Sequence, residues 1–224
     1  MYFLAHMYSI LKALPEEYPQ ELLEPLIVGS WSPDGGYFPH FSWKMRVFSH
    51  TALPPVNFYK NNKAKAFVIG WKTHIACDRL IHEKPFNSNE EPLCSPIQTN
   101  AGVWRYLVSS RKHLGNEVGL DLLIYENLLN EKEWIMNTIS DRTTFLGPKI
   151  KFQGFRLLQK YIHQYTNWFL PIMTNEILGS GIIKEVINYK IYLKENFTEK
   201  VTTLLKEAQI ICKKIVLEGI SSQK

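Results

Sequence analysis

The stretch from Ala66 to Phe86, AFVIGWKTHIACDRLIHEKPF, most constrains what this chain can fold into. It contains His74, Asp78 and His82, which follow one another at intervals of four residues. On an α-helix, this spacing places the three side chains on nearly the same face, one turn apart. The two histidines would lie roughly 12 Å apart along the axis, too far to share one small ion easily, whereas Asp78 can reach toward either. If metal ions bind here, the spacing predicts more than one, with Asp78 as a candidate bridge.

The length and composition are those of a globular protein. The 224 residues include 45% hydrophobic and 21% charged residues, which is ordinary for a soluble domain. We expect a single domain over 1–224, with metal-site helices and a loop in 1–130 and C-terminal helices packed on them in 150–220.

Targeting signals and cysteine pairs are not visible in the sequence. No apolar run approaches the roughly 18 residues that a membrane span needs, and the start MYFLAHMYSILKAL lacks the basic region and cleavage site of a signal peptide. Cys77, Cys94 and Cys212 are widely separated and form no C-x-x-C pair, so neither a disulfide framework nor a thiolate zinc site is indicated. We therefore expect a cytoplasmic protein.

The net charge of +5 is concentrated near the C-terminus. Residues 149–224 contain 12 Lys and Arg against 6 Asp and Glu, whereas the two signs nearly balance before them. Such a charge can attract phosphates or an anionic membrane surface, but lysines along amphipathic helices more often form a solvated face. We favour the solvated face and keep a peripheral membrane contact as an alternative.

Apolar residues recur at helical spacing along most of the chain, and no series of strands is visible. Pro25 is expected to kink or end the second helix, and Gly219 to end the last one. These patterns predict an all-α fold, a multi-helix bundle with helices over about 2–13, 19–29, 63–82, 101–129, 131–139, 153–169, 175–192 and 197–217.

The periodicity is interrupted by the aromatic loop 29–43, GSWSPDGGYFPHFSW, in which Asp34 is the one carboxylate. Its glycines and prolines predict a structured loop rather than a linker, because its large side chains need burial. The aromatic residues considered in this loop are Trp31, Tyr37, Phe38 and Trp43. Together with Trp71, they either line a pocket that receives a head group or a base, or form hydrophobic core beneath the loop.

Histidines and carboxylates gather in the predicted helices. His113 and Glu117 repeat the four-residue spacing, and Asp121 follows one turn later. Imidazole and carboxylate are ligands that zinc accepts, although either helix alone matches an ordinary surface ion pair. The segments fit one buried cluster, whose candidate members are His6, Asp34, His50, His74, Asp78, His82, His113 and Glu117.

Four segments in succession carry a resemblance to a known family. GSWSPDGGYFP, a following FSH, AFVIGWKTHIACDRLIH and RKHLGNEVGLD resemble, over about residues 1–125, the signatures of the zinc-dependent phospholipase C family. The position of the last histidine in the third segment is similar to that of the family's intracellular branch. The family is related in fold and in its trinuclear zinc site to the fungal single-strand nucleases.

The resemblance implies three zinc sites and a role for each ligand. Asp78 would contribute to two of the sites, and Asp34 would also accept a proton from water during catalysis, or be an ordinary turn residue after Pro33. Asp121 would orient a ligand histidine, or be a plain surface carboxylate. The implied sets are Asp34, His50, His74 and Asp78 for the first ion, His82, His113 and Glu117 for the second, and Asp78 with His6 for the third.

Several function classes follow from these observations. We expect a phospholipase C-like hydrolase that uses two or three zinc ions, or other divalent metals, to cleave a phospholipid or another phosphodiester. A nuclease-like phosphodiesterase is the nearest alternative, although nucleic acid is the weaker expectation as a partner. A helical metal-binding or interaction protein without catalysis, and a metal-free core with incidental histidines, are alternatives from other classes. The sequence does not indicate the oligomeric state.

Overall fold

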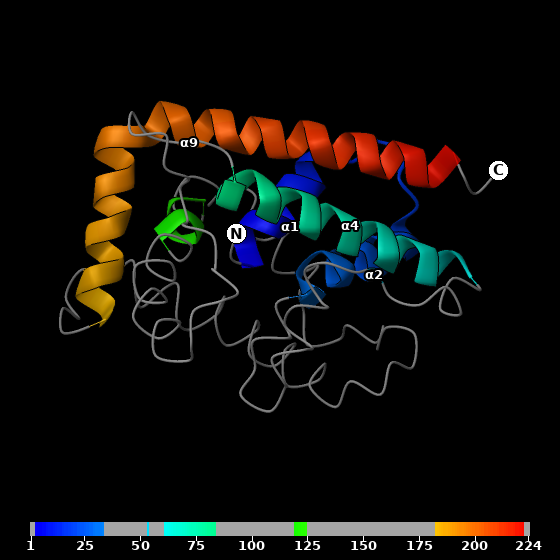
Figure 1. The fold of residues 1–224 in the computed structure, drawn as a ribbon. Helices are drawn as coiled ribbons and strands as arrows, with labels where there is room; N and C mark the ends of the chain where they lie inside the picture. The colour runs from blue at the N-terminus through cyan, green and yellow to red at the C-terminus, as the bar shows by residue number, and fades with distance from the viewer. Residues whose placement is uncertain (1–2, 34–52, 54–60, 84–118, 125–181, 222–224) are drawn as a thin grey trace.

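The computed structural model describes residues 3–33, 53, 61–83, 119–124 and 182–221. These residues form helices without any strand, which confirms the all-α fold. The long C-terminal helix lies across the N-terminal helices, and the first part of that helix turns away from the rest (Figure 1). Among the described residues, no helix is both long and apolar enough to cross a membrane. The single-domain arrangement over 1–224 and the cytoplasmic location stay predictions.

The two N-terminal helices are α1, Phe3–Ala13, and α2, Gln20–Trp31. The α2 helix begins directly after Pro19 and continues through Pro25. Of the two outcomes predicted for Pro25, a kink or an end of the helix, the end is therefore wrong. A proline in the second turn removes one backbone hydrogen bond. The burial of most of the helix, Pro25 included, offsets that loss.

The helix that was expected over 63–82 is α4, Asn62–Glu83. Asn61 caps its start, because the backbone N–H of Ala64 donates to Oδ1 of Asn61 at 2.8 Å. Glycines let α4 cross α2 at very close range: a Cβ atom at Gly70 would overlap the carbonyl oxygen of Leu26, and one at Gly29 would overlap the carbonyl oxygen of Phe67. The two backbones therefore touch, which only glycine permits at these positions.

The C-terminal helix α9, Ile182–Ser221, packs against both α1 and α4. The predicted break between 192 and 197 is wrong, since no glycine or proline interrupts 182–218. The predicted end at Gly219 is also wrong: the helix continues to Ser221, and Gly219 instead fits against the side chain of Ile69.

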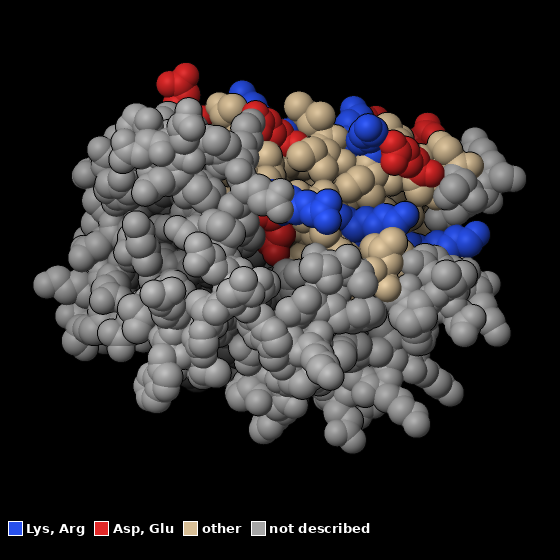
Figure 2. Space-filling model, viewed as in Figure 1, with Lys and Arg blue, Asp and Glu red and all other residues tan. Residues whose placement is uncertain are grey.

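One stripe of α9 enters the core while its other side carries charge. The buried residues recur every three or four positions and are Val201, Leu204, Ala208, Cys212 and Val216. Lys206, Lys213 and Lys214 are exposed, as the solvated-face interpretation requires. Figure 2 shows that the exposed side of α9 and α4 mixes basic and acidic side chains with uncharged ones.

Two aromatic residues from the proposed pocket wall are core residues. Trp31 and Trp71 are both buried, and Trp71 lies against Phe67 with ring centroids 5.8 Å apart. The core alternative therefore holds for these two tryptophans. Tyr37, Phe38 and Trp43 lie outside the described residues.

Candidate metal centre

The α4 helix presents His74 and Asp78 on one face, as their spacing predicts. Nε2 of His74 lies 3.5 Å from Oδ2 of Asp78. His74 is fully buried, whereas 14% of the Asp78 side chain is exposed. The carboxylate is thus the more accessible of the two groups.

His74 is held in place by the neighbouring helix. Its Nδ1 lies 2.8 Å from the carbonyl oxygen of Ser30 at the end of α2. Because a carbonyl oxygen can only accept, Nδ1 carries a proton and donates it, and Nε2 is the ring nitrogen that faces Asp78. The close crossing at Gly29 and Gly70 brings this carbonyl within reach. A ring anchored through one nitrogen in this way is typical of metal-binding histidines.

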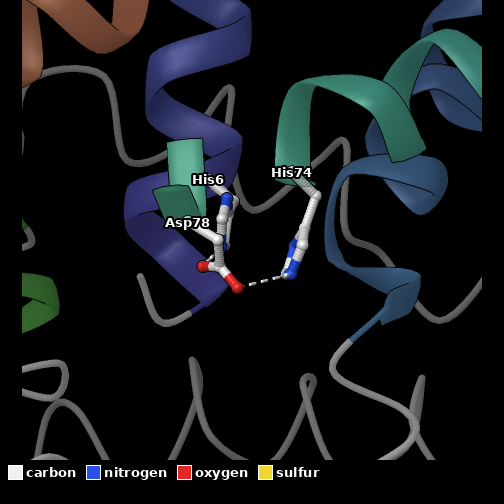
Figure 3. A group of neighbouring side chains, drawn as sticks. All are labelled: His6, His74 and Asp78. Atoms are coloured by element: carbon white, nitrogen blue, oxygen red, sulfur yellow. Dashed lines mark ion pairs between the residues drawn. The ribbon is translucent and has the colours of Figure 1, made fainter. Parts of the chain in front are cut away.

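His6 enters the same site from α1. Its ring stacks on that of His74, with centroids 3.8 Å apart and planes inclined by 20°. Its Nε2 lies 3.3 Å from Oδ1 of Asp78, so the two imidazoles approach different oxygens of one carboxylate. Figure 3 shows the Asp78 carboxylate facing both rings.

The donor set and its burial fit a bound metal ion. One ligand atom from each of His6, His74 and Asp78 lies within 4.8 Å of the other two. His6 is 2% exposed, and neither of its ring nitrogens makes a hydrogen bond, although Nε2 is within ion-pair distance of Asp78. A buried nitrogen without a partner is costly, and a metal ion would supply the missing interaction. Two imidazoles and a carboxylate are ligands that zinc prefers.

The pKa shifts favour the protonation states that metal binding needs. Burial, reinforced by the adjacent His74, lowers the pKa of His6 from 6.5 to about 4, although Asp78 acts in the opposite direction. Burial acts to raise the pKa of Asp78. Neighbouring positive charge and the contacts with His74 and His6 outweigh that effect, so this pKa lies well below its ordinary value. At neutral pH, His6 is a neutral donor and Asp78 an anionic one.

The sequence of the chain was compared with protein-family models, curated proteins and solved structures. Residues 1–168 match the protein-family model described as zinc dependent phospholipase C. The chain belongs to the zinc-dependent phospholipase C family. The matched range extends beyond the resemblance seen in the sequence and contains every candidate ligand. No significant match was found among curated proteins or among solved structures.

Within this phospholipase C family member, the structure brings together three of the predicted ligands. His6, His74 and Asp78 share the site, and His82 lies two turns after His74 on α4 without a described side chain. The other candidates lie outside the described residues; they are Asp34, His50, His113 and Glu117. The assignment of ligands to particular ions therefore stays a prediction.

The sequence interpretation missed two supports of the phospholipase C-like site. The sequence could not indicate the role of the Ser30 carbonyl, because every residue has a backbone carbonyl. Gly29 and Gly70, which lie on two predicted helices, were a visible indication that those helices pack closely. Asp121 was expected either to contact a histidine or to lie on the surface. It is fully buried, so the surface alternative is wrong, and its carboxylate contacts the backbone of α1.

Proposed function

We propose that this protein is a zinc-dependent phosphodiester hydrolase that cleaves the head group of a phospholipid. The observation that carries the proposal is the pair of imidazoles on opposite oxygens of Asp78. A carboxylate with one imidazole near each of its oxygens could bridge two metal ions, because each oxygen could bind a different ion. Membership in the zinc-dependent phospholipase C family supports the same reaction class.

Two or three zinc ions would be held by the candidate ligands. Asp78 would join the ion bound with His74, Asp34 and His50 to the ion bound with His6. The second ion would take His82, His113 and Glu117. Zinc, when bound, supplies Lewis acidity, which makes water a stronger acid and neutralises charge on phosphoryl oxygens.

The residues of the chain have distinct proposed tasks in this reaction. Asp78 remains ionised in the buried site because its pKa is lowered, so it contributes negative charge without competing for a proton. The Ser30 carbonyl fixes the tautomer and direction of His74. Asp34 would accept the proton from the attacking water as the general base.

A metal-binding protein without catalysis is the second candidate. The near-complete burial of His6 and His74 favours it, since structural zinc sites are closed while catalytic sites keep an open position. The partial exposure of Asp78 favours the hydrolase, because it leaves the carboxylate side of the site accessible.

Metal analysis of purified variants tests the site. We expect Asp78→Asn to lower the zinc content of the protein by at least half, because it removes the shared carboxylate. Glu83→Gln removes the other carboxylate of α4 and serves as the matched control. Equal zinc retention in the two variants, or wild-type protein with far less than one metal ion per chain, would contradict the metal centre.

Turnover assays then separate the hydrolase from the binding protein. Phosphatidylcholine, a nitrophenyl phosphodiester and single-stranded DNA should each be incubated with the wild-type protein, with and without a chelator. The proposal expects chelator-sensitive release of the phosphorylated head group, phosphocholine, from phosphatidylcholine. Turnover of the DNA alone would favour the nuclease-like alternative. No turnover of any of the three by zinc-loaded protein would favour the binding protein.

A further inference from the structure

A buried carboxylate far away in the sequence holds the start of α1. Asp121 lies in the helical segment 119–124 and is completely buried. Its Oδ2 accepts a hydrogen bond from the backbone N–H of Leu4 at 3.0 Å, and its Oδ1 accepts one from Ala5 at 2.8 Å. Figure 1 shows the segment 119–124 close to the N-terminal end of α1.

These two hydrogen bonds replace a local helix cap. The first N–H groups of a helix have no partners within the helix, and the first turn of α1 contains no acidic residue. A carboxylate at this end satisfies the N–H groups and interacts favourably with the helix dipole. Asp121 thereby fixes two consecutive peptide units at the start of the helix.

His6 follows directly after the two residues that Asp121 holds. Fixing the N–H groups of Leu4 and Ala5 therefore fixes the position and direction from which the His6 side chain leaves the helix. His74 has its own ring hydrogen bond to Ser30, whereas the ring of His6 has none. The placement of His6 thus depends on its backbone, on stacking against His74 and on the contact of its Nε2 with Asp78.

We propose that Asp121 is a positioning residue that places His6 for metal binding through the backbone of α1. This inference rests on the proposed function, in which His6 is a zinc ligand. Asp121 acts through the backbone of α1, since its two carboxylate oxygens accept hydrogen bonds from the peptide N–H groups of Leu4 and Ala5. Its replacement should alter the metal environment by displacing the helix that carries a ligand.

A double-mutant cycle with metal affinity as the readout tests the proposal. Zinc affinity is measured by competition with a chromophoric chelator for the wild type, Asp121→Asn, His6→Ala and the double variant. Asparagine keeps one acceptor but turns an NH2 group toward a peptide N–H, so we expect about tenfold weaker zinc binding. The double variant should bind as weakly as His6→Ala alone, because both changes remove the same ligand.

The spectrum of bound cobalt provides a second readout. Co²⁺-loaded Asp121→Asn should show the same change in visible absorption as Co²⁺-loaded His6→Ala, which a general loss of stability would not produce. Asp121→Glu keeps the charge and both acceptors, so it should fold and retain more of the wild-type affinity than Asn. Glu21→Gln removes an exposed carboxylate from the first turn of α2 and is the matched control, with unchanged zinc affinity.

The outcomes distinguish this inference from the proposed function. If His6→Ala leaves zinc affinity unchanged, His6 is not a ligand and both proposals lose their basis. If His6→Ala weakens binding but Asp121→Asn and Asp121→Glu do not, only the positioning role is overturned. Strictly additive losses in the cycle, with an unchanged cobalt spectrum in Asp121→Asn, would also overturn it.

Discussion

The two sides of the candidate metal centre are fixed by different means. On the α4 side, His74 and Asp78 stand on a helix whose backbone touches that of α2, and His74 is anchored by a hydrogen bond to Ser30. On the α1 side, His6 has no ring hydrogen bond and depends on a helix start held by Asp121. The difference indicates a preformed α4 side and an α1 side that is more sensitive to distant changes.

The largest expected effect comes from breaking the close crossing of α4 and α2. In Gly70→Ala, the added methyl group would overlap the backbone carbonyl of Leu26, which cannot rotate away. We expect the free energy of unfolding in urea to fall by about 3 kcal/mol, and zinc affinity to fall as well, because the Ser30 carbonyl moves away from His74.

The control for Gly70→Ala is Gly219→Ala on α9. There the added methyl group would overlap the side chain of Ile69, which can shift further than a backbone carbonyl, and alanine favours the helix. Its unfolding free energy should fall by about 1 kcal/mol, clearly less than in Gly70→Ala. A loss in Gly219→Ala as large as in Gly70→Ala would show that the backbone contact with α2 is not the special feature of the α4 side.

The sequence predicted the α4 side far better than the α1 side, for a physical reason. His74 and Asp78 belong to one helix, and a helix turns a spacing of four residues into a shared face. The position of His6 relative to Asp78 depends on how α1 and α4 pack, which helical periodicity does not predict. The pairing of His6 with Asp78 was predicted only from the resemblance to the family. The cap by Asp121 joins residues 117 positions apart, and no local pattern encodes that pairing.

The errors in the predicted elements have the same origin. Pro25 and Gly219 are local signals for a helix end, and local propensity is weak compared with tertiary burial. Burial of α2 allows that helix to continue through Pro25, and the packing of Gly219 against Ile69 allows α9 to continue beyond Gly219. The all-α fold was predictable because periodicity alone decides it.

The second prediction tests the α1 side through the pH dependence of the metal-free protein. The pKa of His6 is lowered from 6.5 to about 4, so between these values the unfolded chain binds a proton that the folded protein does not. Stability therefore falls as the pH is lowered from 6.5 to 4, by about 3 kcal/mol. Urea unfolding at several pH values in the presence of a chelator measures this loss.

The variant His6→Gln isolates the contribution of this one group to the pH dependence. It should be distinctly less sensitive to pH between 4 and 6.5, since the titrating imidazole is gone. Below pH 3.8 both proteins should lose further stability, because the lowered pKa of Asp78 stabilises only the ionised folded state. Identical pH profiles of the wild type and His6→Gln above pH 4 would contradict the neutral, buried state of His6.

The smallest effect is expected where Cys77 of α4 meets Cys212 of α9, with their sulfur atoms 3.5 Å apart. Contact with Cys212 and burial raise the pKa of Cys77, so Cys77 packs as a neutral thiol against Cys212, and both cysteines are free and buried. Cys212→Ala removes one buried sulfur and should lower the unfolding free energy by about 1 to 2 kcal/mol. Zinc affinity should stay within about twofold, because packing against α2 still holds His74 and Asp78. A tenfold loss of affinity would mean that α9, and not the crossing with α2 alone, keeps the α4 side of the centre in place.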